Sequence, residues 1–205
     1  MSGNQNLKAM KIGIIGTGAI GTAFAKQVAA AGYEVVISNS RGADTLKEKV
    51  KQIGGNTTAG SVKEAAEADV IFLALQWQHL QQVLTTVSLE GKIVIDPTNP
   101  ILPGFVLADL YGKTSSEVVS EWAKGAKLVK AFNTLQPQTL VANPQTNGGN
   151  RVIFYSGNDD DAKDILTGIL NRIGFAGVDL GRLNEGGKLQ QFPGGSLPTL
   201  NLIKL

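Results

Sequence analysis

A glycine-rich turn near the start of the chain constrains the fold more than any other feature. Residues 11–22 read KIGIIGTGAIGT, an apolar run that breaks into glycines and continues as the helical pattern AFAKQVAAA. This order predicts a strand, a tight turn and a helix whose free N–H groups favour an anion. Gly16 permits the turn, Gly18 leaves room for a pyrophosphate, and Gly21 lets the helix approach the strand. The predicted dinucleotide-binding residues are Gly16, Thr17, Gly18, Ala19, Ile20 and Gly21.

The end of the second predicted strand indicates which dinucleotide binds. NAD-selective sites place an Asp or Glu there, about twenty residues after the glycine turn, to hold the ribose 2′-hydroxyl. Here the strand 33–37 is followed by Ser38, Asn39, Ser40 and Arg41. Hydroxyl, amide and guanidinium groups suit a 2′-phosphate dianion. The sequence therefore predicts NADP(H) rather than NAD(H); the alternative is an ordinary polar loop with one surface arginine.

Short apolar strands alternate with helical patterns along the rest of the chain, which is typical of a parallel sheet wound with helices. We expect strands at 56–59, 69–75, 92–96 and 127–131, helices at 43–53, 62–66, 78–87 and 116–123, and a last β-α-β unit at 152–180. The predicted fold is α/β, a Rossmann-type doubly wound parallel sheet with a small C-terminal β-α-β extension. We expect one NADP-binding domain over residues 11–205 and a flexible leader over residues 1–10.

The composition argues against several kinds of site. The chain has 19 basic and 17 acidic residues, a near balance that disfavours a nucleic-acid partner. One His and no Cys leave little for a metal centre and nothing for a thiolate nucleophile. No apolar run approaches the roughly 20 residues that span a bilayer, and the first ten residues contain no signal-peptide core. We expect a cytoplasmic protein with no metal, membrane or nucleic-acid partner.

Loops that follow three of the predicted strands carry further candidate residues, because the carboxyl ends of parallel strands line the ligand crevice. In the first loop, Leu75, Gln76 and Trp77 are candidate cofactor-binding residues: Leu75 offers an apolar wall and Trp77 a ring for stacking. Trp77 and His79 are also suited to a packed first helical turn, which is favoured for His79. The other two loops contain Asn99 and Asn133. Either asparagine could orient a carboxamide or a ring carbonyl, or form a turn.

No arrangement of nucleophile, base and orienting group can be assembled from these residues, so we predict no catalytic acid or base. Asp96 is expected to cap a turn, and Lys130 is the only lysine expected near the crevice. Hydride transfer between two ring cofactors depends on stacking of the rings more than on a protein acid, because the cofactors carry the electronics.

With these residues in place, the chain resembles the NADPH-dependent deazaflavin oxidoreductase family, whose members pass hydride between NADPH and coenzyme F420. The resemblance extends over 11–180 and is carried by KIGIIGTGAIG, SNSRG, QWQH, GKIVIDPTNP and VKAFNT. It implies that Ser40 and Arg41 grip the 2′-phosphate and that Thr17 belongs to the phosphate turn. Archaeal members usually have Pro before the Trp, where this chain has Gln76 before Trp77.

The sequence therefore predicts an NADP(H)-dependent oxidoreductase that transfers hydride between NADPH and a small-molecule acceptor of the flavin or deazaflavin type. Two alternatives remain: a non-catalytic NADP-binding regulatory module, and a reductase of a small carbonyl or imine. The latter class needs a long helical second domain, whereas another β-α-β pattern follows Lys130. We also predict a homodimer in which the leucine-rich tail, 189–205, takes part, the alternative being a tail folded over its own sheet.

Overall fold

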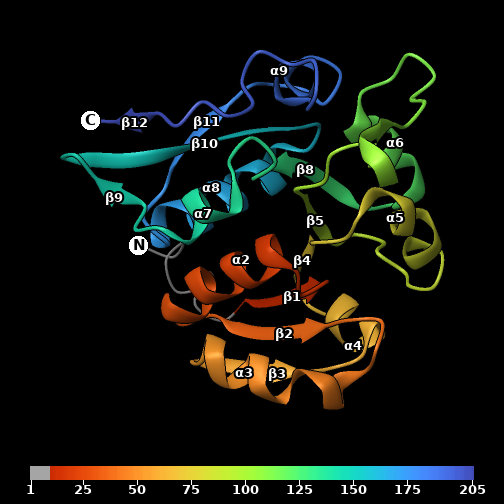
Figure 1. Cartoon of the computed structure of the whole chain (residues 1–205), viewed down its shortest axis with the longest axis vertical. Helices are drawn as coiled ribbons and strands as arrows, with labels where there is room; N and C mark the ends of the chain where they lie inside the picture. Colours follow the sequence, from red (N-terminus) through yellow and green to blue (C-terminus); the bar gives the residue numbers. More distant parts are fainter. Residues whose placement is uncertain (1–9) are drawn as a thin grey trace.

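A single twisted sheet forms the centre of the computed structural model, which describes residues 10–205. The predicted flexible leader lies, apart from Met10, outside the described residues; Met10 packs against the core. The strands of the sheet are β1 (Lys11–Ile15), β2 (Glu34–Ser38), β3 (Asn56–Ala59), β4 (Val70–Leu73), β5 (Ile93–Asp96), β8 (Lys127–Ala131), β9 (Gln145–Thr146), β10 (Gly149–Gly157), β11 (Ala176–Asp179) and β12 (Ile203–Lys204). Their order is β11-β10-β8-β5-β4-β1-β2-β3, with β9 and β12 paired to β10 (Figure 1).

Helices cover both faces of the sheet. They are α2 (Ala19–Ala30), α3 (Lys47–Ile53), α4 (Val62–Ala66), α5 (Trp77–Leu84), α6 (Ser115–Trp122), α7 (Pro137–Val141), α8 (Asp160–Arg172) and α9 (Gly186–Gln190), with a 3-10 turn, η1, at Ala43–Leu46. The core over one face includes buried residues of α2 and α8, and the core over the other includes buried residues of α4, α5 and α6. Phe24 of α2 stacks on Phe72 of β4 with ring centroids 4.1 Å apart. This two-sided arrangement confirms the predicted Rossmann-type α/β fold.

The C-terminal extension joins the main sheet with its first strand reversed. β10 runs antiparallel to β8, with Tyr155 opposite Ala131 and Gly157 opposite Val129. The connection between the two strands, residues 132–148, contains the short helix α7 and the strand β9, which itself pairs antiparallel with β10. The chain then forms the predicted β-α-β unit, since β10 and β11 are parallel and α8 connects them. The sheet is therefore mixed at this end.

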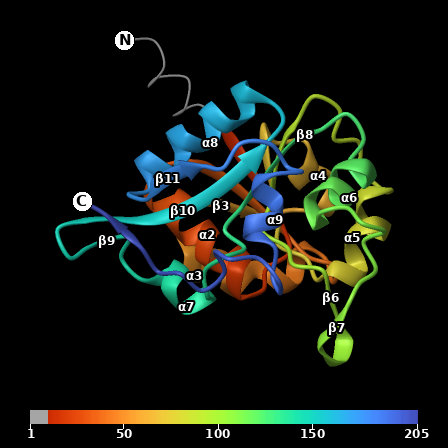
Figure 2. The same cartoon turned by 90° about the horizontal axis from the view of Figure 1, so that it is seen from above.

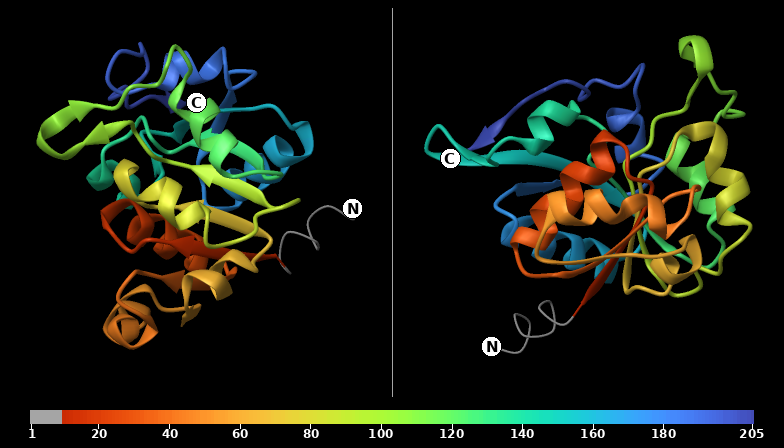
Figure 3. Two further views of the ribbon diagram at one scale, coloured as in Figure 1. Left: turned by 90° about the vertical axis from the view of Figure 1, so that its right-hand side faces the viewer. Right: turned by 60° about the horizontal axis from the view of Figure 1, so that its bottom comes forward.

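A small hairpin projects from the body after β5. Its strands are β6 (Ile101–Leu102) and β7 (Val106–Leu107), joined by a 3-10 turn at Pro103–Phe105. The hairpin stands away from the sheet in Figures 2 and 3. Phe105, Val106 and Leu107 are exposed on it.

The leucine-rich tail folds over its own sheet in this structure. Thr199 N donates to the Thr134 carbonyl at 2.7 Å, Val152 N donates to the Leu202 carbonyl at 2.9 Å, and β12 pairs with β10. These contacts correspond to the alternative given above for the tail; the homodimer stays a prediction. Among residues 10–205, no helix combines the length and the apolar character that crossing a bilayer requires. The same part of the chain contains no cluster of three His, Cys, Asp or Glu side chains suited to a metal ion.

Candidate functional site

The glycine turn after β1 has the shape that an anion requires. Gly16 has a φ of +104°, a conformation that L side chains rarely adopt, and its N–H donates to the Ser38 carbonyl at 2.9 Å. A Cβ on Gly21 would lie 2.2 Å from the Gly16 carbonyl oxygen, whereas a Cβ on Gly18 would have no neighbour within 4 Å. No side chain caps the start of α2, and its first turn contains no acidic residue. The turn therefore leaves open space beside free amides that a pyrophosphate would fill.

A cavity of about 510 Å³ extends from this turn along the carboxyl ends of the strands. Eight of the predicted residues line it: Gly16, Thr17, Gly18, Asn39, Ser40, Arg41, Leu75 and Gln76. His79 also lines it and is exposed, so the packed position favoured for this residue was wrong. The wall is completed by residues that were not predicted to bind the cofactor: Ile15, Val62, Ala74, Gln82, Val83 and Thr86. Gly21 is buried behind the turn, while Ala19 and Ile20 line two neighbouring hollows.

The polar turn after β2 presents a cation and no carboxylate to this cavity. Asn39 shapes the turn: its Oδ1 accepts from Arg41 N at 2.9 Å and its Nδ2 donates to Thr45 Oγ1 at 3.0 Å. Arg41 is exposed and takes part in none of the ion pairs formed by residues 10–205. Its guanidinium and the Ser40 hydroxyl are therefore available for a 2′-phosphate.

Two predicted cofactor-binding residues lie elsewhere. Ser38 is fully buried, and its hydroxyl donates to the Ile14 carbonyl at 3.2 Å, so it ties β2 to β1 and does not face the cavity. Trp77 is 6% exposed and packs against Trp122 of α6 with ring centroids 5.3 Å apart. It begins the apolar face of α5 that continues through Leu80, and that face is buried.

A second cavity, of about 370 Å³, lies beyond the start of α2 at the same edge of the sheet. We name it the ring cavity; its lining residues are Ile20, Pro97, Asn99, Phe132, Asn133, Thr134, Leu135, Gln136, Pro137, Phe192, Pro198 and Thr199. The two predicted asparagines meet here. Asn133 Nδ2 donates to Asn99 Oδ1 at 3.0 Å, and Asn99 Nδ2 donates to the Asn133 carbonyl at 3.3 Å. Both asparagines line this cavity, and their role in binding the cofactor stays a prediction.

The tail supplies part of the ring cavity that the sequence did not predict. Phe192, Pro198 and Thr199 form one wall, and the buried Gln190 holds Asn133 in place. Asn133 Nδ2 donates to the Gln190 carbonyl at 2.7 Å, and Gln190 Nε2 donates to the Phe154 carbonyl at 3.1 Å. No signal in the sequence indicates this contact, because it depends on the reversed direction of β10, to which α9 is bound.

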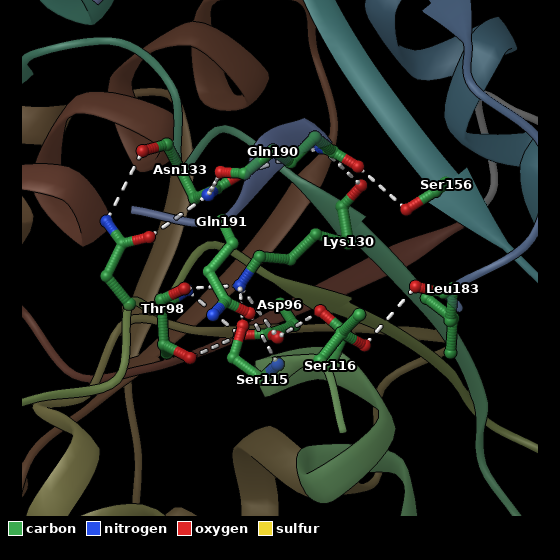
Figure 4. A network of polar contacts seen from close by, with 12 residues as sticks. Asp96, Thr98, Ser115, Ser116, Lys130, Asn133, Ser156, Leu183, Gln190 and Gln191 are labelled. Atoms are coloured by element: carbon green, nitrogen blue, oxygen red, sulfur yellow. Dashed lines mark hydrogen bonds and ion pairs between the residues drawn. The ribbon is translucent and has the colours of Figure 1, made fainter. Parts of the chain in front are cut away.

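A buried ion pair lies behind the asparagines (Figure 4). Lys130 Nζ is 3.2 Å from Asp96 Oδ2, and neither side chain is exposed to solvent. The ammonium also donates to the Thr98 carbonyl and, at 3.4 Å, to Ser115 Oγ. Burial lowers the pKa of Lys130, and the neighbouring Asp96 carboxylate opposes that shift. The pair therefore joins β8 to the end of β5 from within the protein.

Asp96 organises the same loop from the other side. Its Oδ1 accepts from the backbone N–H of Thr98 at 2.9 Å and from the Thr98 hydroxyl at 2.6 Å, and its Oδ2 accepts from Ser116 Oγ at 3.1 Å. The predicted turn-capping role of Asp96 is confirmed. Thr98 is thus held through three of its groups, and it directly precedes Asn99. The charged pair positions the asparagine and does not reach the cavity itself.

Two features of the loop after β8 are energetically unfavourable. Phe132 has a φ of +67° and packs edge-on against Phe24 at 5.1 Å, an unusual conformation for a buried aromatic residue. Such strained residues cluster at binding sites. Thr134 also lines the ring cavity, and its hydroxyl is buried without a hydrogen-bond partner, which costs free energy.

Known proteins share both the sequence and the fold. The family model for NADP oxidoreductase, coenzyme F420-dependent, matches residues 11–100. The F420-dependent NADP reductase of Methanothermobacter marburgensis is 28% identical over 86% of both chains. The rat metalloreductase STEAP3 is 26% identical over 94% of this chain, which spans 38% of the length of that relative.

A solved structure extends the likeness to the whole fold. A hypothetical protein from Sinorhizobium meliloti superposes with a TM-score of 0.89 at 43% identity, over 96% of each chain. The matched segment 11–100 contains the glycine turn, the Arg41 turn and Asn99. Over residues 11–100, the chain therefore matches the family of coenzyme F420-dependent NADP oxidoreductases.

Proposed function

We propose that this protein transfers hydride from NADPH to a flat ring acceptor of the flavin or deazaflavin type. The observation that carries the proposal is the placement of two different cavities at one edge of the sheet, with the start of α2 between them. Gly18 lines the cavity that contains Arg41, and Ile20 lines the ring cavity. An extended dinucleotide bound at the glycine turn is thus directed toward a polar, cationic cavity at one end and an uncharged one at the other.

The residues present fit NADPH. The Arg41 guanidinium and the Ser40 hydroxyl would hold the 2′-phosphate, and the amides at the glycine turn would hold the pyrophosphate. Asn99 and Asn133 would orient the nicotinamide amide. Bound NADPH supplies the hydride, and the acceptor completes its reduction with a proton from water.

The ring cavity offers no acid or base. None of its lining residues has a titratable side chain. Lys130 is enclosed by its own partners and is fully buried, so it has no access to a ligand. Reduction of a simple carbonyl or imine is helped by a positioned proton donor, whereas a flavin-type ring spreads the incoming charge over its own atoms. The site therefore supports a ring acceptor.

The experiment is to follow NADPH oxidation in the presence of riboflavin, FMN, FAD or coenzyme F420, with NADH as the control donor. We expect turnover with at least one ring acceptor and a clear preference for NADPH. Replacement of His79 by Ala should slow turnover only modestly, because the histidine lines the nucleotide cavity and not the ring cavity. A loss of about a thousandfold with intact NADPH binding would reveal acid-base catalysis and contradict the proposal.

We also propose a cytoplasmic homodimer. The absence of cysteine suits a reducing compartment. Leu200 and Leu202 remain exposed although the tail lies on its own sheet, so they are available to a second copy. Light scattering of the intact chain and of a variant lacking residues 195–205 tests the assembly. A monomeric intact chain would contradict it.

A further inference from the structure

We propose that Lys26 and Lys49 bind a phosphate at the end of a polar chain on the acceptor, in a groove outside both cavities. The groove runs along residues 19–26 of α2, bounded by Lys49 of α3 on one side and residues 137–141 of α7 on the other; we name it the lysine groove. The inference rests on the proposed function, because it concerns the part of the acceptor that extends beyond the ring. It gives the acceptor a second binding site on this chain.

Three helices form the lysine groove. In Figure 1, α7 and α3 lie on either side of α2, and both contact it. Gln27 Nε2 of α2 donates to the Leu140 carbonyl of α7 at 3.3 Å, which holds these two helices beside each other. The space between the helices measures about 670 Å³. The groove is thus built from the folded body of the protein and has room for an extended chain.

The charges in the lysine groove favour an anion. Lys26 and Lys49 both line it, and none of its lining residues is acidic. Neither lysine takes part in an ion pair formed by residues 10–205. By contrast, Lys47 and Lys51 of the same helix are each paired with a carboxylate three residues earlier in the chain. Two ammonium groups that no carboxylate neutralises suit a phosphate dianion.

The lysine groove adjoins the ring cavity. Pro137 lines both, and Ala19 of the groove directly precedes Ile20 of the ring cavity. From Ala19 to Lys26, α2 rises by about 10 Å, at roughly 1.5 Å per residue. A sugar-alcohol chain with a terminal phosphate spans a distance of this order. An acceptor whose ring lies in the ring cavity can therefore place its phosphate beside the two lysines.

Uncharged polar groups lie along the same groove. Thr22 and Gln138 line it from α2 and α7. The Thr22 hydroxyl donates to the Thr17 carbonyl at 3.2 Å, so its oxygen can still accept from a hydroxyl of a ligand. Gln138 is exposed, and its amide offers both donors and an acceptor. Hydroxyl and amide groups together with the two lysines match a hydroxylated chain that ends in a phosphate.

A second hollow with basic residues fits this role less well. Lys113 and Lys188 line it together with Asp109, and Lys113 is paired with Glu121. Both carboxylates would repel a phosphate. This hollow also shares no lining residue with the ring cavity. The lysine groove is therefore the better site for an anionic chain that continues from the ring.

The first test compares riboflavin with FMN, which has the same ring and chain and one added phosphate. Flavin fluorescence is titrated with the protein in the presence of saturating NADP+. We expect the Kd for FMN to be lower than that for riboflavin by about tenfold or more. Equal Kd values for the two flavins, or no binding of FMN, would overturn the proposal.

Substitution of the two lysines locates the phosphate. The double variant Lys26→Gln with Lys49→Gln should bind FMN and riboflavin within about twofold of each other, while the Kd for riboflavin stays unchanged. Lys51→Gln is the matched control, because Lys51 lies on the same helix as Lys49, is paired with Glu48 and does not line the groove. A preference for FMN that persists in the double variant would overturn the proposal.

Two further measurements exclude other roles for the lysines. Calorimetric titration should give the same Kd for NADPH in the double variant and the unmodified protein. Weaker NADPH binding with an unchanged preference for FMN would assign the lysines to the nucleotide and overturn the proposal. Ribose 5-phosphate has the phosphate without the ring and should displace FMN only at a concentration about a hundredfold higher. Displacement at an equal concentration would show a site for free sugar phosphates and would also contradict the proposal.

Flavin binding without turnover separates this inference from the proposed function. If FMN binds more tightly than riboflavin, and the lysine substitutions remove that difference, the phosphate site stands even when no NADPH oxidation is detected. If NADPH is oxidised by riboflavin and FMN with equal kcat/KM, and the substitutions have no effect, hydride transfer stands and the phosphate site does not.

Discussion

Lys130 and Asp96 lie 3.2 Å apart in a part of the protein that solvent does not reach, one at the carboxyl end of β8 and the other at the end of β5. Through the Thr98 carbonyl, the lysine fixes the residue that precedes Asn99, and three residues after the lysine the chain reaches Asn133. Geometry at the ring cavity is therefore coupled to a charged pair that no ligand touches.

This coupling is measurable in a double-mutant cycle. Lys130→Met should lower the free energy of unfolding by roughly 3 to 5 kcal/mol, because it leaves the Asp96 carboxylate buried without its cation. The double variant, Lys130→Met with Asp96→Asn, should lose less free energy of unfolding than the two single variants lose together. Urea unfolding of the four proteins gives the coupling energy, and simple additivity would show that the two residues act independently.

Arg41 is expected to decide between the two nicotinamide cofactors. Arg41→Ala should weaken the binding of NADPH by about tenfold or more, since a charge-assisted hydrogen bond contributes roughly 1.5 to 3 kcal/mol. The binding of NADH should stay nearly unchanged. Calorimetric titration with both nucleotides measures this. Lys47→Ala is the matched control, because that lysine is paired with Asp44 and does not line the cavity. Equal losses for NADPH and NADH in Arg41→Ala would refute the assignment.

Gly18 and Gly21 should respond differently to the same substitution. Gly18→Val should abolish nucleotide binding and leave the melting temperature nearly unchanged, because the new side chain enters open space that a pyrophosphate needs. Gly21→Val should instead disrupt the fold, since its Cβ would lie 2.2 Å from the Gly16 carbonyl oxygen. Titration beside a melting curve separates the two effects, and retained binding in Gly18→Val would mean that the turn is only structural.

Asp159, the N-cap of α8, should make stability depend on pH. Its Oδ1 accepts from Ala162 N at 2.8 Å and its Oδ2 is 3.0 Å from Lys127 Nζ, and these two contacts, in that order, lower the pKa of the carboxyl group below its ordinary value of 3.8. A lowered carboxyl pKa contributes stability above the unfolded-state value, and that contribution is lost as pH falls through the folded-state value.

Asp159→Ala should therefore reduce stability at pH 7 by about 1 kcal/mol, or roughly 2 to 4 °C in Tm. The difference from the unmodified protein should shrink as pH falls below 3.8. Asp161→Ala is the control, because Asp161 is largely exposed and lies 3.7 Å from the same lysine. A Tm difference that stays constant from neutral to acid pH would contradict this account.

The sequence was sufficient for the parts of the site that depend on local chemistry. Gly16 is required by the turn itself, and Arg41 follows the end of a strand that is marked by its apolar run. Asn99 and Asn133 were found in the same way, because each follows a strand and parallel strands end at one edge.

The errors arise where tertiary packing decides. Ser38 still belongs to β2, so its hydroxyl bonds to the neighbouring strand and not to a ligand. Trp77 has the composition of a stacking residue, but its position on the apolar face of α5 buries it against Trp122. Gln190 and Phe192 are far from the other site residues in sequence, and tertiary contacts such as that of Gln190 with Asn133 bring them close.

The last part of the chain, which packs beside the reversed strand β10, lines only one of the two cavities. All the residues that line the nucleotide cavity lie between Ile15 and Thr86, whereas Phe192, Pro198 and Thr199 of the ring cavity belong to the last fifteen residues. The tail is therefore one segment to exchange, together with the loops that contain Asn99 and Asn133, when the acceptor specificity of such a reductase is redesigned.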